Sequence, residues 1–170
     1  MASSMSDIVT TRLVLRPITA GEVSAVLSGQ RRSDWAGDFP AEGDQVIARL
    51  LARTGLPSDG DARRFGHRLV VERDTGTVVG GAGFFGPPQE GEVEIGYGIV
   101  PSRQRRGYAT EAVRAMVADI FQLDNVQIVT ANVDLDNLAP IRVLEKSGLA
   151  RCSQNQEQAT YHVRRSPPGR

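Results

Sequence analysis

The fold is decided by the stretch Glu92-Val-Glu-Ile-Gly-Tyr-Gly-Ile-Val-Pro-Ser-Arg-Gln-Arg-Arg-Gly-Tyr-Ala-Thr-Glu-Ala112. Its first residues alternate between apolar and small or acidic side chains, which is typical of a strand, and its last residues begin a helix. A glycine-bearing turn between a strand and a helix directs free backbone N–H groups to one point, where the helix dipole is positive. This segment therefore predicts a site for a phosphate or pyrophosphate group.

The two faces of the expected strand differ in character. Its apolar residues share one face, whereas Glu92, Glu94, Gly96 and Gly98 share the other. Because glycines carry no side chain, we expect the second face to be open to close approach by a ligand or another backbone.

Strands and helices interleave along the rest of the chain, with hairpins in the middle, which predicts an α/β (α+β mixed) fold. A capping box at Thr19 and Glu22 begins the first expected helix, and Gly148 ends the last. Expected strands cover 12–18, 68–72, 78–85, 92–100, 126–133, 149–153 and 160–164; expected helices cover 19–29, 45–54, 108–121 and 138–147.

Length and composition restrict the class of protein. A chain of 170 residues favours one domain, expected over 11–165, with flexible ends at 1–10 and 166–170. The 20 basic and 20 acidic residues balance, which gives no general attraction to nucleic acid or a membrane. Cys152 is the one cysteine, which excludes an intramolecular disulfide and fits a reducing, cytoplasmic location.

Two motifs carry a family resemblance. They are Gln104-Arg-Arg-Gly107-Tyr-Ala109, followed by Thr110-Glu-Ala112, and Asn137-Leu-Ala-Pro-Ile-Arg-Val-Leu-Glu-Lys-Ser-Gly148. With Arg12-Leu-Val-Leu-Arg16 and Glu94-Ile-Gly-Tyr97, they make the chain resemble the GCN5-related N-acetyltransferase (GNAT) superfamily over about 11–165. Within it, the chain looks most like the ribosomal-protein-alanine N-acetyltransferase branch. The resemblance implies a mixed, mostly antiparallel sheet of about seven strands flanked by about four helices.

The resemblance also implies acetyl-CoA as cosubstrate, and the residues themselves suggest no metal site. Its pyrophosphate would lie on the turn, and its pantetheine arm along the strand backbone, where an N–H of Ile99 or Val100 would polarise the thioester carbonyl. Asn137 is either a contact to the CoA arm or an ordinary helix N-cap. Pro140 replaces a serine of the branch, so that polar contact is not carried over. The expected cofactor residues are Ile99, Val100, Gln104, Arg105, Arg106, Gly107, Tyr108, Ala109, Thr110 and Asn137.

An amine must lose a proton before it attacks a thioester, so a general base is needed. Glu94 on the open strand face is our candidate, because partial burial would make it a stronger base. Glu92 on the same face is the second candidate, and the alternative is that both carboxylates only solvate an edge. Many enzymes of the superfamily use a tyrosine in this late helix as the general acid that protonates the departing CoA thiolate. The helix expected over 138–147 has no tyrosine, so the general acid is left unassigned.

The acceptor side is expected at the loop 31–40. This location is implied by the resemblance. Trp35 and Phe39 would form an apolar wall and Asp34 or Asp38 would attract an amine, while the alternative for Trp35 is a core anchor. His67 and His162 stand without a Cys or Asp cluster, which favours structural roles over metal binding.

Together these observations predict an N-acetyltransferase that moves acetyl directly from acetyl-CoA to a primary amine, either a protein N-terminus or a small amine. The alternative is a module that senses acyl-CoA without turnover. Nucleic-acid binding through Arg103–Arg106 is disfavoured by the acidic neighbours, and the expected state is a monomer or homodimer.

Overall fold

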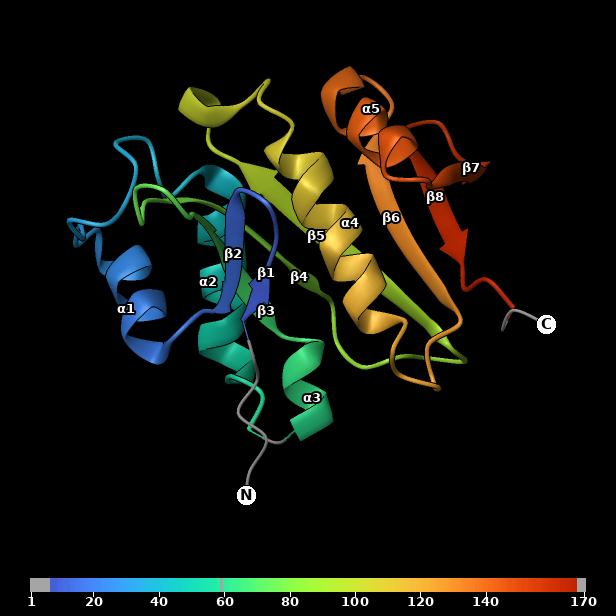
Figure 1. Ribbon diagram of the computed structural model, residues 1–170, viewed down its shortest axis with the longest axis horizontal. Helices are drawn as coiled ribbons and strands as arrows, with labels where there is room; N and C mark the ends of the chain where they lie inside the picture. The colour runs from blue at the N-terminus through green and yellow to red at the C-terminus, as the bar shows by residue number, and fades with distance from the viewer. Residues whose placement is uncertain (1–6, 59, 168–170) are drawn as a thin grey trace.

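A computed structural model describes residues 7–58 and 60–167. The fold is one sheet with helices on both faces (Figure 1). Its strands are β1 (Ile8–Val9), β2 (Leu13–Pro17), β3 (His67–Glu72), β4 (Val78–Phe84), β5 (Glu92–Ile99), β6 (Ile128–Asp134), β7 (Ala150–Gln154) and β8 (Gln158–Arg164). Its helices are α1 (Ala20–Ser28), α2 (Glu42–Thr54), α3 (Gly60–Arg64), α4 (Tyr108–Ile120) and α5 (Leu138–Lys146), with a 3₁₀ turn η1 at Pro101–Arg103.

The strands form one eight-stranded sheet in the order β1-β2-β3-β4-β5-β6-β8-β7. Neighbouring strands are antiparallel except β5 and β6, which run parallel. The mixed, mostly antiparallel sheet expected from the sequence is confirmed. The described residues form eight strands and five α-helices, in place of about seven and about four.

Two helices cover the part of the sheet that holds the decisive segment. Figure 1 shows α4 crossing the near face in front of β5, while α2 lies behind the sheet. Helix α4 buries the stripe Ala112, Val113, Met116 and Ile120, and the apolar face of β5 is buried at Val93 and Ile95. The glycine-bearing face of β5 is therefore the one turned toward α2.

Most element boundaries agree with the sequence, and the exceptions have local causes. The capping box forms, because Thr19 Oγ1 accepts from the Glu22 N–H at 3.2 Å and the Glu22 carboxylate accepts from the Thr19 N–H at 2.9 Å. Helix α2 begins at Glu42, before the expected start at residue 45, and Asp44 in its first turn accepts from the Ala41 N–H at 2.9 Å. Helix α3 has no counterpart among the expected helices.

The chain ends lie mostly outside the described residues. Residues 1–6 and 168–170 of the expected flexible ends are not described. Ile8 and Val9, which the sequence placed in the flexible N-terminal end, pair with Leu15 and Val14 as the short edge strand β1.

Candidate active site

The sheet opens between β5 and β6. These strands pair only from Glu92, opposite Ile128, to Glu94, opposite Thr130. Beyond this point they diverge toward their carboxyl ends (Figure 1). The other edge of β5 stays paired with β4, up to the Val100 N–H, which donates to the Val79 carbonyl at 2.9 Å. The backbone of β5 therefore faces an open split on its β6 side.

Ile99 and Val100 use their backbones differently. The N–H of Val100 is already bonded to β4. Because backbone groups alternate in direction along a strand, the N–H of Ile99 points to the split. The Ile99 carbonyl accepts from Gln104 Nε2 at 2.9 Å, which ties the following turn to the end of β5. Of the two expected oxyanion donors, Ile99 has the suitable direction.

The expected phosphate turn has the backbone of an anion site. Gly107 is the N-cap of α4 with φ 81°, and no side chain that the structure describes caps the helix. Arg105 also has a left-handed backbone, with φ 64°. The amides of Tyr108, Ala109 and Thr110 thus begin a 13-residue helix with no capping side chain among the described residues.

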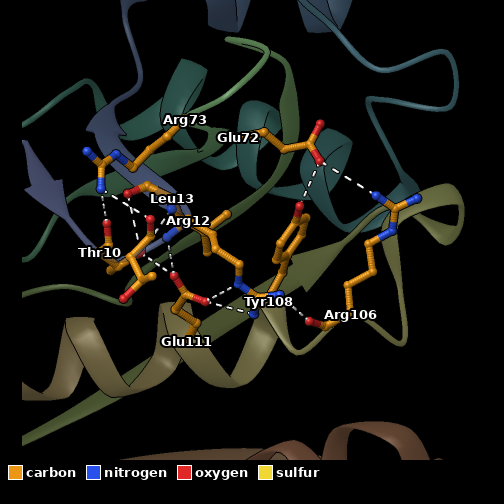
Figure 2. Close-up of polar contacts among 9 residues, drawn as sticks. Thr10, Arg12, Leu13, Glu72, Arg73, Arg106, Tyr108 and Glu111 are labelled. Carbon is orange, nitrogen blue, oxygen red and sulfur yellow. Dashed lines mark hydrogen bonds and ion pairs between the residues drawn. The ribbon is translucent and has the colours of Figure 1, made fainter.

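Arg12, directly before β2, braces this turn (Figure 2). Its Nη1 donates to the Arg106 carbonyl at 2.7 Å and its Nε to the Glu111 carboxylate at 2.8 Å. The guanidinium also lies over the Tyr108 ring, 4.8 Å from the ring centre. Thr10 completes the brace by donating to Glu111 Oε1 at 2.6 Å. The start of α4 is therefore fixed to the sheet.

Glu72 at the end of β3 holds the turn from the other side. Its carboxylate accepts from the Tyr108 hydroxyl at 2.8 Å and from Arg103 Nε at 3.3 Å, and lies 3.9 Å from Arg106 Nη1. Burial alone would raise the pKa of Glu72, but these hydrogen bonds and a third from Thr75 outweigh it and lower the pKa. Glu72 thus stays ionised and partly neutralises two arginines of the turn.

A cavity of about 410 Å³, the smaller cavity, lies in the split between β5, β6 and α5. Glu94, Tyr97, Asn137 and Pro140 are among its lining residues. The Tyr97 hydroxyl donates to the Pro140 carbonyl at 3.0 Å. Asn137 occupies the N-cap position of α5 but makes no capping bond with its side chain. Its amide therefore borders the split without serving the helix.

The two candidate bases differ in their surroundings. Glu94 is half-buried and accepts from Asn132 Nδ2 at 3.0 Å, whereas Glu92 is exposed at the start of β5. Glu94 lies five residues before Ile99, which is about 16 Å along a strand. This distance is too long for direct contact or for one bridging water, so a proton could pass from an amine near Ile99 to Glu94 only along a chain of water molecules.

A second, larger cavity of about 910 Å³ lies between α2, α3 and the glycine face of the sheet. Its floor is Gly81 and Gly83 of β4 and Gly96 and Gly98 of β5. Its walls are mainly apolar and include Ile47, Leu50, Leu51, Leu56, Phe65, Phe84 and Phe85. The larger and smaller cavities share Phe85, Gly96 and Tyr97, so they adjoin.

The expected acceptor loop does not form this wall. Trp35 is 6% exposed and Phe39 is 1% exposed, with ring centres 5.0 Å apart in an edge-to-face pair. Neither is among the described residues that line either cavity. Asp34 is exposed, with its carboxylate 3.7 Å from the Arg16 guanidinium. The acceptor-wall interpretation is thus corrected to the core-anchor alternative, because the loop bonds to Val78 and turns its aromatics inward.

The larger cavity is lined by an acidic residue and a histidine that the sequence did not assign to a site. Asp44 comes from the first turn of α2, and His67 from the start of β3. Their meeting depends on the packing of α2 over β4. The available signal was the run of small residues Val78-Val-Gly-Gly-Ala-Gly83, since strand glycines mark close approach of other groups.

Two further classes of feature are absent from the described part of the chain. Within residues 7–58 and 60–167, no group of three or more His, Cys, Asp or Glu side chains is arranged to hold a metal ion. No helix in these ranges is long and apolar enough to cross a membrane.

Comparison with known proteins identifies the family. The model of the acetyltransferase (GNAT) domain matches residues 12–150. The chain belongs to the GNAT family. The N-acetyltransferase YjdG of Bacillus subtilis, itself uncharacterized, is 34% identical over 113 residues, which is 66% of this chain and 67% of that protein. The protein is therefore an acetyl-CoA-dependent acyltransferase of the N-acetyltransferase type.

Solved GNAT structures share the fold. One, assigned as a ribosomal-protein-serine acetyltransferase from Vibrio cholerae, has a TM-score of 0.66 at 22% identity and covers 97% of this chain and 100% of its own. The spermidine N-acetyltransferase of Vibrio cholerae, in complex with CoA and spermine, has a TM-score of 0.64 at 14% identity and covers 91% of this chain and 96% of its own. One fold thus serves different acceptors, and the acceptor must be argued from the site.

Proposed function

We propose that this GNAT enzyme transfers an acetyl group from acetyl-CoA directly to a primary amine, with no covalent enzyme intermediate. The observation that carries the proposal is the split between β5 and β6, which adjoins both cavities. The split runs along β5, and the end of β5 is tied to the turn before α4, which has no described capping side chain. A ligand with a phosphate group at one end and an extended arm at the other would fit a path from the turn along the split, and acetyl-CoA is such a ligand.

The donor would be bound mostly by backbone groups. The pyrophosphate would lie on the turn Arg105–Ala109, at the positive end of α4, with Gln104 and Thr110 flanking it. The pantetheine arm would pair with the free edge of β5 and contact Asn137. The Ile99 N–H would donate to the thioester oxygen, whose charge grows as the amine attacks.

Glu94 would act as the general base. The carboxylate is held by Asn132 and lies in the smaller cavity, next to the split. An ammonium ion must lose its proton to become a nucleophile, and a base of this kind contributes roughly 10²- to 10⁴-fold to the rate. The strand spacing requires a chain of several water molecules to carry the proton from an amine beside Ile99 to Glu94.

The acceptor would approach from the larger cavity. This space opens onto the glycine face of β5 beside the split and is separate from the turn that would hold the phosphates. The enzyme can then bind both substrates together, which direct transfer requires. We also propose that the enzyme is cytoplasmic and that it is a monomer or a homodimer.

The test is release of the CoA thiol from acetyl-CoA, measured with a panel of amines and a blank without acceptor. Acceptor-dependent release supports the transferase. Tight binding of acetyl-CoA in calorimetry without release for any amine would instead favour a sensor of acyl-CoA. An absence of both binding and release would overturn the donor assignment.

A further inference from the structure

Asp44 and His67 converge over a single glycine of β4. A Cβ atom built on Gly81 would lie 2.6 Å from His67 Nε2 and 3.0 Å from Asp44 Oδ1. A Cβ atom on Gly83 would lie 2.6 Å from His67 Nδ1. The imidazole therefore occupies the space above both glycines, and the carboxylate reaches the same place from α2. Side chains at these positions of β4 would expel both groups.

The floor beside this pair is empty. Gly81 lies opposite Gly98 in the β4–β5 register, and neighbouring strands are about 4.8 Å apart. A Cβ atom on Gly98 would meet no described atom within 4 Å. Gly98 precedes Ile99, whose N–H points to the split. A small group over Gly98 would therefore lie between the Asp44–His67 pair and the expected thioester.

The larger cavity contains one unbalanced charge. Among the described residues that line it, Asp44 is the one with a formal charge at neutral pH, and none is a lysine or arginine. Burial raises the pKa of Asp44 to about 6 and lowers the pKa of His67 to about 4. At pH 7 the site thus presents a carboxylate and a neutral imidazole. The Asp44 carboxylate accepts from the Ala41 N–H, but no cation lines the described cavity, and a carboxylate without a counter-ion in an apolar space is costly until a cation joins it.

We propose that Asp44 and His67 bind the ammonium group of the acceptor, and that this acceptor is a small monoamine with an apolar aryl or alkyl body. The inference rests on the transferase function proposed above and names its substrate class.

The shape and chemistry of the cavity select this class. One carboxylate matches one ammonium group, whereas the further ammonium groups of a polyamine would meet Ile47, Leu50 and Phe65 without a counter-ion. The carboxylate of a free amino acid would likewise find no cation among the described lining residues. The apolar walls suit a hydrocarbon body, and the volume is that of a small-molecule pocket.

The experiment compares acceptors with the intact protein. Michaelis constants are measured for 2-phenylethylamine, spermidine, L-phenylalanine and an alanine-initiated peptide, by CoA thiol release. We expect 2-phenylethylamine to have the lowest KM. Asp44→Asn should raise that KM at least about tenfold, the loss that one charge-assisted hydrogen bond produces. An asparagine still accepts from the Ala41 N–H, so the start of α2 is kept.

The matched control is Glu42→Gln, which removes an equal charge from the same helical turn but lies outside the cavity. It should leave the KM unchanged. Gly98→Ala is the second variant: its methyl group meets no described atom but would occupy the floor over which the amine lies. It should keep the melting temperature and raise the KM. Binding of 2-phenylethylamine to the CoA complex is measured in parallel by calorimetry.

The outcomes separate this inference from the function beneath it. A lower KM for spermidine or the peptide, an unchanged KM in Asp44→Asn, or no calorimetric binding of 2-phenylethylamine overturns the inference and leaves the transferase standing. Failure of acetyl-CoA itself to bind overturns the proposed function instead.

Discussion

Asn132 of β6 donates a hydrogen bond of 3.0 Å to the Glu94 carboxylate of β5, across the strand pair whose divergence opens the split. Asn132 is itself oriented, because its Oδ1 accepts from the Thr160 hydroxyl at 2.6 Å. The chain Thr160–Asn132–Glu94 therefore fixes one carboxylate oxygen at the edge of the smaller cavity. In the proposed role as general base, Glu94 would need no reorganisation before it accepts a proton.

Replacement of Glu94 by glutamine should reduce kcat by roughly 10²- to 10⁴-fold, because an amide accepts the Asn132 bond but cannot take a proton at neutral pH. Affinity for acetyl-CoA, measured by calorimetry, should not change. Glu92→Gln is the matched control, since Glu92 is exposed on the same face of β5. Equal losses of kcat in the two variants would argue against a specific role for Glu94.

Gly107→Ala should weaken acetyl-CoA binding and destabilise the fold. The φ of 81° costs a residue with a side chain about 1–2 kcal/mol, and the new Cβ would lie 3.2 Å from Arg12 Nη2, which braces the turn. Gly76→Ala in the β3–β4 turn has a similar φ of 70° and no atom within 4 Å of its Cβ. It should show the stability loss in urea unfolding without the loss of acetyl-CoA affinity.

Arg105→Gly should stabilise the fold, and it tests whether the Arg105 side chain contributes to acetyl-CoA binding. Arg105 is exposed with φ 64°, and glycine adopts this backbone without the steric cost of about 1 kcal/mol or more. If the guanidinium also contacts a phosphate, the dissociation constant of acetyl-CoA should rise and lose part of its dependence on salt. A more stable variant with unchanged affinity would restrict the phosphate site to backbone amides.

The features predictable from the sequence are those set by short-range chemistry. The capping box of Thr19 and Glu22 fixed the start of α1, and the apolar stripe from Ala112 to Ile120 fixed α4 and the face that it buries. The turn at Gly107 was also predictable, because a left-handed backbone between a strand and a helix favours glycine locally. Such signals act within one or two turns, so they survive without knowledge of the tertiary contacts.

The remaining features depend on contacts between distant segments. Trp35 and Phe39 suggested an exposed wall, but Val78 bonds to their loop and both rings enter the core. Asp44 and His67 meet only because α2 lies over the glycines of β4. Neither spacing nor composition indicates which side of a loop faces the sheet, since that is decided by the packing of the two layers.

Asp44→Asn should also change the pH dependence of stability. Burial raises the pKa of Asp44 from its ordinary value of 3.8 to about 6, so the folded state favours the protonated form and this carboxyl costs roughly 3 kcal/mol once the pH has risen through that window. Burial lowers the pKa of His67 from 6.5 to about 4, which costs a similar amount as the pH falls through its own window. The two slopes have opposite signs and nearly cancel between about pH 4 and pH 6.

The variant removes the first slope and keeps the second. Its free energy of unfolding in urea should exceed that of the wild type by roughly 2 kcal/mol at pH 7, after allowance for the weaker interaction of asparagine with the helix dipole. Its stability should then fall steadily as the pH is lowered from about 6.5 to 4, where the His67 imidazole must take up a proton in an apolar space. Superimposable pH profiles of the two proteins would show that Asp44 is solvated rather than buried, and would remove the electrostatic reason for a cation at this site.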